Sequence, residues 1–202
     1  MTALYTSDSI AESQRLIDAL ERHAADLPFA SEHLAIYRPA HHTLEQCQHR
    51  SEDAVAAWQV ALARRWECEI AARRLFKQIY GQYVAFYGSA TCREVQRIAS
   101  SHSEGDGSPA DLLADLRRLH ADLTLQHDDG FLGRCNELER ACNMLTFAIR
   151  EATACEAARR TSVIDRRIAQ EALRRARNTT QRALLSLSDE VIGAEELREL
   201  LA

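Results

Sequence analysis

Apolar residues recur every three or four positions along almost the whole chain, and this spacing predicts helices rather than strands. The first helical stretch covers about 9–27. Two longer stretches, about 41–87 and 134–192, contain no proline and only Gly81. Alanine, leucine, arginine and glutamate, which all favour helices, are the most frequent residues. The sequence therefore predicts an all-α protein built around two long helices.

Prolines mark where these helices are expected to begin and end. Pro28 is expected to end the first helix, and the connection that follows is expected to hold only a turn of helix up to Pro39. Thr91 and Glu94 have the spacing of a capping box, which predicts a shorter helix there. Pro109 suits the first turn of another main helix, because the amide groups of a first turn have no partner within the helix.

The chain also carries an internal similarity. LIDALERHAADL (16–27) matches LLADLRRLHADL (112–123) at an offset of 96, with leucine, arginine and aspartate in register. Further along, CEIAARR (68–74) resembles CEAARR (155–160) at an offset near 87. Each match begins a segment with almost no glycine or proline, so we predict a duplicated helical hairpin.

This duplication predicts the organisation of the chain as a single domain. Repeat 1 is expected at about 9–101, a linker at 102–108 and repeat 2 at about 109–188, followed by a short C-terminal helix in 189–202. The four main helices are expected to pack as one antiparallel bundle, with short satellite helices beside it.

The two long helices are much longer than the short helices expected to pack against them. A helix of about 50 residues spans about 75 Å, whereas one of about 19 residues spans about 28 Å. The part of each long helix that extends beyond its short partner must bend back, pair with the other repeat or pair with another subunit, so we expect a homodimer. The segment 178–180 (Asn-Thr-Thr) is where the last long helix is expected to bend or break. Charged residues interrupt the apolar stripes near the middle of the long helices: Arg65, Glu69, Glu156, Arg159 and Arg166.

Composition narrows the class of protein. The 202 residues have a net charge of −5, which disfavours a protein whose whole surface meets nucleic acid. The hydrophobic content of 46% excludes global disorder. No apolar run is long enough to cross a bilayer and the first residues do not resemble a secretion signal, so we expect a cytoplasmic protein. Lys77 is the only lysine among 25 basic residues, a bias typical of a GC-rich bacterial genome.

The six cysteines do not indicate a metal or redox motif, because none of them forms a C-x-x-C pair. In the cytoplasm they are expected to be reduced thiols. Cys135 and Cys142 lie seven residues apart on one helix face, where we expect them to be buried as small apolar residues.

A histidine-rich segment is the best candidate for a metal site. His41, Glu45 and His49 follow one another at intervals of four and therefore share one face of a helix. His120 and His127 lie seven apart on the helix that follows Pro109. Bundles that bind two iron ions collect such ligands from facing helices, although no Glu-x-x-His pair occurs here. A metal-binding bundle is thus one alternative function, and no other cofactor is expected.

Arginine pairs along the last long helix are the candidate anion-binding residues. They recur at intervals of seven or eight: Arg159, Arg160, Arg166, Arg167, Arg174 and Arg175. Such a stripe would bind nucleic acid or an anionic lipid surface, which is the second alternative function. No aromatic residue is interleaved with these pairs, and acidic helices can neutralise them within the fold, so ion pairing inside the protein or between subunits is the expected role.

Aromatic residues concentrate in the first long helix, and core packing accounts for most of them. Trp66 and Tyr87 fall outside the apolar stripe and are candidates for a subunit interface. No nucleophile elbow, glycine-rich phosphate loop or nucleotide fingerprint is present. The sequence therefore favours a non-enzymatic helical scaffold or protein-interaction module, whose partner is another protein or a second copy of the chain.

Overall fold

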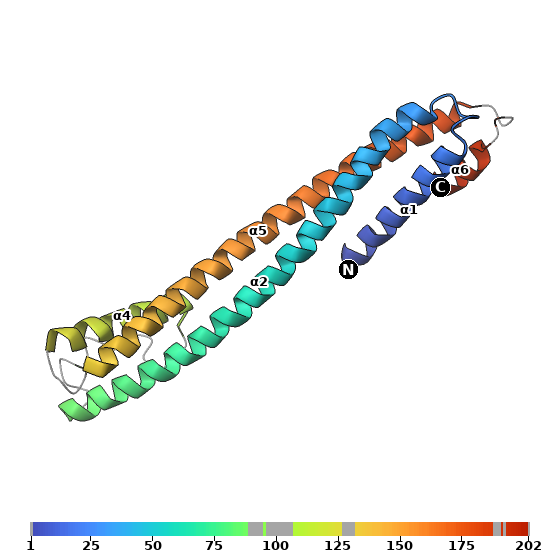
Figure 1. The fold of residues 1–202 in the computed structure, drawn as a ribbon. Helices are drawn as coiled ribbons and strands as arrows, with labels where there is room; N and C mark the ends of the chain where they lie inside the picture. The colour runs from blue at the N-terminus through green and yellow to red at the C-terminus, as the bar shows by residue number, and fades with distance from the viewer. Residues whose placement is uncertain are drawn as a thin grey trace. The chain divides into compact units, whose positions relative to one another are not determined.

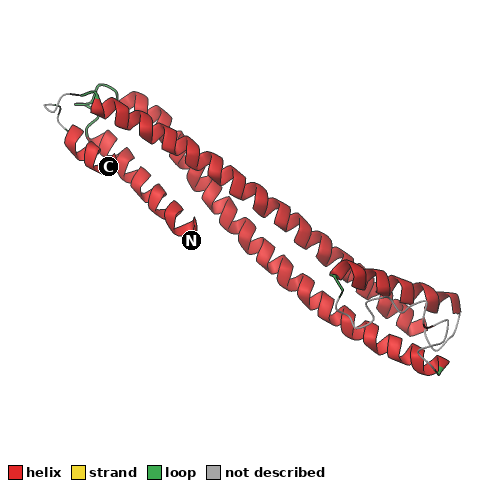
Figure 2. Ribbon diagram, turned by 180° about the vertical axis from the view of Figure 1, so that it is seen from behind, coloured by secondary structure: helices red, strands yellow, loops and turns green. Residues whose placement is uncertain are grey.

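The computed structural model describes residues 2–88, 95, 107–126, 132–187, 191 and 193–201. Within these ranges the chain forms five helices and no strand, which confirms the expected all-α class (Figures 1 and 2). The helices are α1 (Thr2–Arg22), α2 (Ala30–Tyr87), α4 (Pro109–Gln126), α5 (Leu132–Leu185) and α6 (Ala194–Leu201). Over this described part of the chain, no helix combines the length and the apolar character needed to cross a membrane.

The chain divides into two compact units. Unit 1 is Met1–Val55 with Ala158–Ala202, and therefore contains α1, the first part of α2, the last part of α5, and α6. Unit 2 is Ala56–Ala157, which contains α4 and the remaining parts of both long helices. Within each unit α2 and α5 run side by side in opposite directions (Figures 1 and 2). Each long helix thus pairs with the other long helix, whereas the single four-helix bundle, the duplication and the domain count stay predictions.

A repeat of seven residues decides which face of each long helix is buried. In α2 the alternating steps of three and four follow the pattern of a coiled coil, which keeps one stripe of side chains facing the neighbouring helix. One set of these positions, none of them exposed, is Ala30, Tyr37, Leu44, Ser51, Trp58, Arg65, Ala72 and Ile79. The corresponding set in α5 is Leu138, Leu145, Ala152, Arg159, Arg166, Leu173 and Thr180.

Helix α2 begins well before residue 41, where the sequence predicted it, and it continues through Pro39. The expectation that Pro39 marks a helix boundary is wrong. Proline inside a helix removes a backbone hydrogen bond and costs about 3 kcal/mol. Ala30, Leu34 and Tyr37, on the turns before it, are buried in the core of unit 1. Burying a large apolar side chain contributes about 1.5–3 kcal/mol, so this packing offsets the loss.

The predicted weak point in the last long helix does not break it, because α5 continues to Leu185. The Thr179 hydroxyl donates to the carbonyl oxygen of Arg175 at 2.9 Å. The Thr180 hydroxyl donates in the same way to Ala176 at 3.1 Å. Both polar side chains are therefore satisfied within the helix, and the backbone keeps its helical hydrogen bonds.

Helix α4 begins at Pro109, as the sequence predicts. A side-chain cap explains why it begins there: Asp111 Oδ2 accepts hydrogen bonds from the Ser108 backbone nitrogen at 2.9 Å and from the Ser108 hydroxyl at 2.7 Å. The predicted linker at 102–108 and the predicted helix at Thr91 lie largely outside the described residues. Val95 is described there, and it is fully buried in the core of unit 2.

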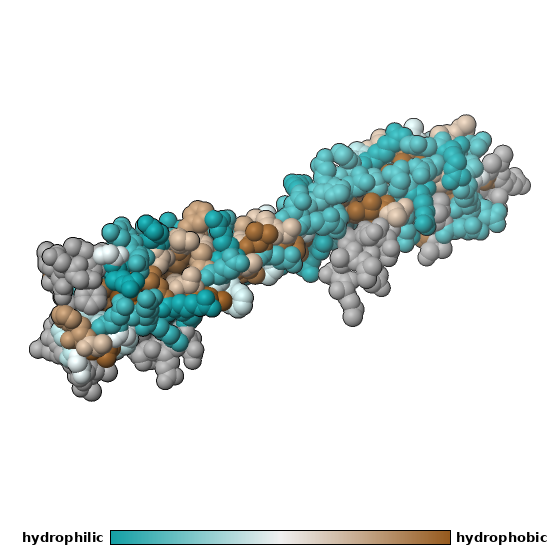
Figure 3. Space-filling model, turned by 60° about the horizontal axis from the view of Figure 1, so that its bottom comes forward, coloured by the Kyte–Doolittle hydropathy of each residue, from teal (hydrophilic) through white to brown (hydrophobic). Residues whose placement is uncertain are grey.

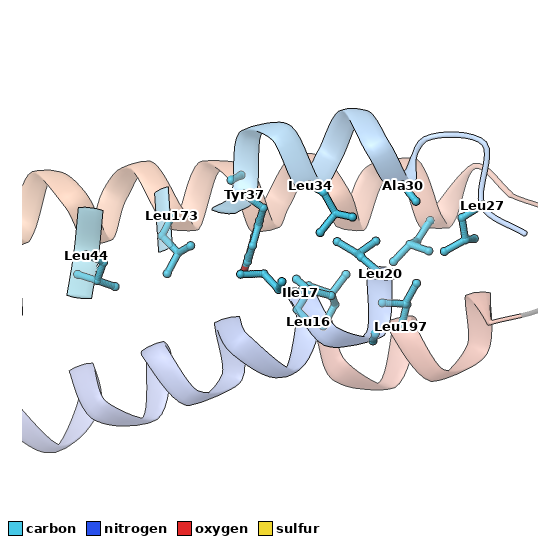
Figure 4. Packing of buried hydrophobic residues seen from close by; sticks show 14 of the residues in the cluster. Leu16, Ile17, Leu20, Leu27, Ala30, Leu34, Tyr37, Leu44, Leu173 and Leu197 are labelled. Atoms are coloured by element: carbon cyan, nitrogen blue, oxygen red, sulfur yellow. The ribbon is translucent and has the colours of Figure 1, made fainter. Parts of the chain in front are cut away.

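Each unit has its own apolar core. In unit 1, leucines of α1 meet side chains of α2, α5 and α6, and Figure 4 shows them pointing toward one another. In unit 2, leucines of α4 pack between the aromatic end of α2 and the start of α5. Cys142 is buried in this second core, as expected, and Cys135 packs against it with partial burial. The cores therefore form where short helices meet both long ones: α1 and α6 in unit 1, and α4 in unit 2.

Candidate functional site

The predicted metal ligands of α2 share one helix face but not one environment. His41 is buried, and its Nδ1 lies 2.9 Å from the Ser13 hydroxyl oxygen of α1. Its Nε2 lies 3.5 Å from a carboxylate oxygen of Glu45. His49, by contrast, is 81% exposed and lies 3.8 Å from Glu52. The structure therefore brings His41 and Glu45 together and leaves His49 pointing into solvent.

The other predicted metal ligands do not complete this site. His120 belongs to α4 in unit 2, and His127 lies outside the described residues. Across the described part of the chain, no group of three or more histidine, cysteine, aspartate or glutamate side chains could hold a metal ion. Metal binding therefore gains no support from the geometry of these residues.

Buried polar pairs are a feature of unit 1 that the sequence did not single out. His33 Nδ1 lies 2.8 Å from the Thr180 hydroxyl, and both side chains are buried. Burial lowers the pKa of His33, although the carboxylate of Glu32 acts in the opposite direction. Burial also raises the pKa of Tyr37, beside the pair formed by Ser13 and His41. Because each of these groups has a hydrogen-bond partner, they are best explained as satisfied core residues.

The arginine pairs of α5 do not form one continuous surface. The first members of two pairs, Arg159 and Arg166, lie on the buried stripe of the helix. The last pair is partly neutralised locally, because the single carboxylate of Glu171 lies 3.0 Å from Arg174 and 3.3 Å from Arg175. Hydrogen bonds from these arginines lower the pKa of Glu171. The exposed members are Arg160, Arg167, Arg174 and Arg175. The predicted anion-binding stripe is thus divided between the buried and exposed sides of α5.

Unit 2 contains an apolar groove of about 220 Å³ between α2 and α5. Its lining combines small side chains with longer ones and includes Cys68, Ala71 and Leu75 of α2 and Arg140, Ala141 and Met144 of α5. Alanine side chains on both sides leave the depression unfilled. Unit 1 has a groove of about 400 Å³, but its lining mixes Arg50, Ser162 and Asp165 with small residues.

Exposed large apolar side chains lie on α2 and α5 of unit 2, in the groove lining or within about two turns of it along the helix. Met144 is 56% exposed, and Phe147, three residues further along α5, is 57% exposed. The Arg64 guanidinium lies 5.5 Å from the centre of the Phe147 ring and 3.4 Å from Glu151. Val60, one turn before Arg64, is 69% exposed. We call the groove together with Val60 and Phe147 the groove face; Figure 3 shows apolar side chains reaching the surface of the molecule.

The two aromatic residues predicted at a subunit interface differ in exposure. Trp66 is 64% exposed. Tyr87 is partly buried, with its ring 4.8 Å from that of Tyr83 and 5.2 Å from that of Phe86. Their role at an interface stays a prediction. Met144 and Phe147 were identifiable from the sequence only as apolar residues outside the buried stripe of α5.

No protein-family model, curated protein or solved structure matches this chain. The groove face combines an apolar centre with charged residues at its edge, which is the composition of a protein-binding surface. Exposed apolar patches that are bordered by polar residues are also a feature of interaction sites. Among the described residues, this surface is the candidate functional site.

Proposed function

We propose that this protein is a non-enzymatic helical scaffold that binds protein through the groove face of unit 2. The observation that carries the proposal is the exposure of Met144 and Phe147 beside an apolar groove. Fully burying a side chain of this size contributes about 1.5–3 kcal/mol. A partner that covers both residues would gain an appreciable part of that energy.

The charges around the groove face support a specific rather than a general hydrophobic contact. Arg64 and Arg140 supply positive charge at its edge, and Glu137 and Glu151 supply negative charge. Charged residues at the edge of an apolar contact set its orientation and disfavour wrong partners. A protein partner in the cytoplasm, or a second copy of the chain, fits this surface.

We also propose that α1–α2 and α4–α5 are copies of one hairpin, and that the four main helices pack as an antiparallel bundle. The support is that leucines aligned at an offset of 96 are equally buried in the two units. The pairs, with their exposed fractions, are Leu16 (2%) with Leu112 (4%), Leu20 (0%) with Leu116 (0%), and Leu27 (2%) with Leu123 (2%).

Photo-crosslinking in cells tests the binding function. A benzoylphenylalanine at position 147 is expected to produce a discrete crosslinked protein band, because Phe147 lies at the contact surface. The matched control is position 168, since Ile168 is 65% exposed on the same helix but belongs to unit 1. Equal crosslinking at both positions, or none at 147, would contradict the proposal.

A further inference from the structure

Four side chains on the side of α5 next to α2 in unit 2 follow the spacing of a helix-pairing stripe. Arg140, Met144, Phe147 and Glu151 are separated by four, three and four residues. This alternation places them on one side of the helix, as in a coiled coil. Met144 and Phe147 are more than half exposed, and the Glu151 side chain is 33% exposed. The stripe is therefore available to a partner helix.

The order of these residues is self-complementary. Read in either direction, the stripe runs from a charged residue through two apolar residues to a residue of opposite charge. If a second α5 lies antiparallel to the first, Arg140 faces the partner's Glu151, and Met144 faces the partner's Phe147. A two-fold axis repeats each of these contacts, as in an isologous dimer. A parallel alignment would instead place like charges opposite each other.

We propose that the groove face binds a second copy of this chain, with the two α5 helices antiparallel and Arg140 paired with the partner's Glu151. The inference rests on the proposed function and names the partner of the same surface.

The neighbouring side chains are compatible with this pairing. Ala141 lies beside Met144 in the groove lining, and its small side chain allows two helices to approach closely. The thioether of methionine packs favourably against an aromatic ring at about 5 Å. Glu151 already lies 3.4 Å from Arg64, so in the dimer its carboxylate would lie between two guanidinium groups.

Charge reversal with complementation tests the inference on the full-length protein. Arg140→Glu and Glu151→Arg each create two like-charge contacts in a homodimer, and each is expected to weaken self-association about tenfold or more in analytical ultracentrifugation. A mixture of the two variants is expected to associate like the wild type, because an Arg140→Glu chain and a Glu151→Arg chain match at both contacts. Arg167→Glu, an equal charge change at an exposed site in unit 1, is expected to leave association unchanged.

Three results would overturn the inference. These are a wild-type protein that stays monomeric up to about 1 mM, variants that associate like the wild type, and a mixture that fails to recover association. Circular dichroism of each variant separates loss of association from loss of folding. If the purified chain is monomeric while position 147 crosslinks a different protein in cells, this inference fails and the proposed function stands. If neither association nor crosslinking occurs, both fail.

Discussion

Units 1 and 2 use short helices with matching leucines but fill the rest of their interiors differently. Unit 1 buries hydrogen-bonded polar pairs, such as His33 with Thr180. Unit 2 packs aromatic rings, with Phe76 stacked on Tyr80 at 5.6 Å between ring centres. Unit 2 also has the more apolar groove, with Phe147 exposed at its edge. The same helical framework therefore accommodates hydrogen-bonded polar pairs in one unit and stacked aromatic rings in the other.

In unit 1, the short helix α6 packs against α1 and forms ion pairs with residues at the end of α1. Helix α6 contacts α1, and Glu196 lies 2.7 Å from Arg22 and 2.8 Å from His23. Gly193, just before α6, has a φ of 81°, which favours glycine. A β-carbon there would also lie 2.4 Å from the His23 ring. The contact between α1 and α6 therefore requires glycine at this position.

The largest expected effect tests whether the two cores are equivalent. Leu20→Ala in α1 and Leu116→Ala in α4 each remove a fully buried leucine side chain, and each is expected to lower the free energy of unfolding by about 2–5 kcal/mol. Urea denaturation of both variants measures this loss. A difference of several kcal/mol between them would show that the two leucines do not play the same part in their units.

A smaller effect is expected at the buried polar pair of unit 1. Thr180→Val leaves His33 Nδ1 buried without its hydroxyl partner and is expected to cost about 1–3 kcal/mol of stability. The control is Thr179→Val, because Thr179 is exposed and bonds only within its helix. A Thr180→Val variant as stable as the wild type would contradict a structural role for the pair formed by His33 and Thr180.

A hydrogen bond of unit 2 is expected to contribute less. Tyr83→Phe removes the hydrogen bond to Asp122, and a loss of about 0.5–1.5 kcal/mol in the free energy of unfolding is expected.

The free energy of unfolding is expected to depend on pH through His33, a buried residue of unit 1. Burial lowers the pKa of His33 below its ordinary value of 6.5. The unfolded chain therefore takes up a proton at a higher pH than the native one, so stability falls as the pH drops below 6.5 toward the native pKa. His33→Gln is expected to reduce this slope between pH 7.5 and 5.5 in urea denaturation. His49→Gln, at an exposed site, is expected to retain it.

The smallest effect is expected at the edge of unit 1. Hydrogen bonds from His23 and Arg22 lower the pKa of Glu196, so its contribution is present at neutral pH and is lost as the pH falls through that lowered pKa, below 4.5. Because Arg22 and Glu196 are exposed to solvent, Glu196→Gln is expected to leave the midpoint of thermal unfolding at pH 7 nearly unchanged. A large drop would mean that this contact, rather than apolar packing, holds α6 in place.

The repeating apolar pattern was sufficient to predict the all-α class and the two long helices, and the preference of proline for a first helical turn predicted the start of α4 at Pro109. The pattern did not predict that α2 continues through Pro39. The burial of Leu34 and Tyr37 outweighs the tendency of proline to interrupt a helix. The candidate surface was harder to predict. Met144 and Phe147 lie outside the apolar stripe in sequence, but only packing shows which side of α5 remains uncovered. The sequence also could not predict the partner of a buried polar residue, such as Thr180 for His33, because the two residues meet only in the folded structure.

The seven-residue repeat of α2 also limits how the length of this protein can vary. Deleting one residue from a helix rotates everything after it by about 100°, which would turn Ile79 and Tyr83 away from the core. Deleting seven residues removes about two turns and keeps every later side chain on its original face. Natural variants that shorten or lengthen α2 are therefore expected to do so in steps of seven residues, with an equal change in α5, because the two helices contribute to both cores.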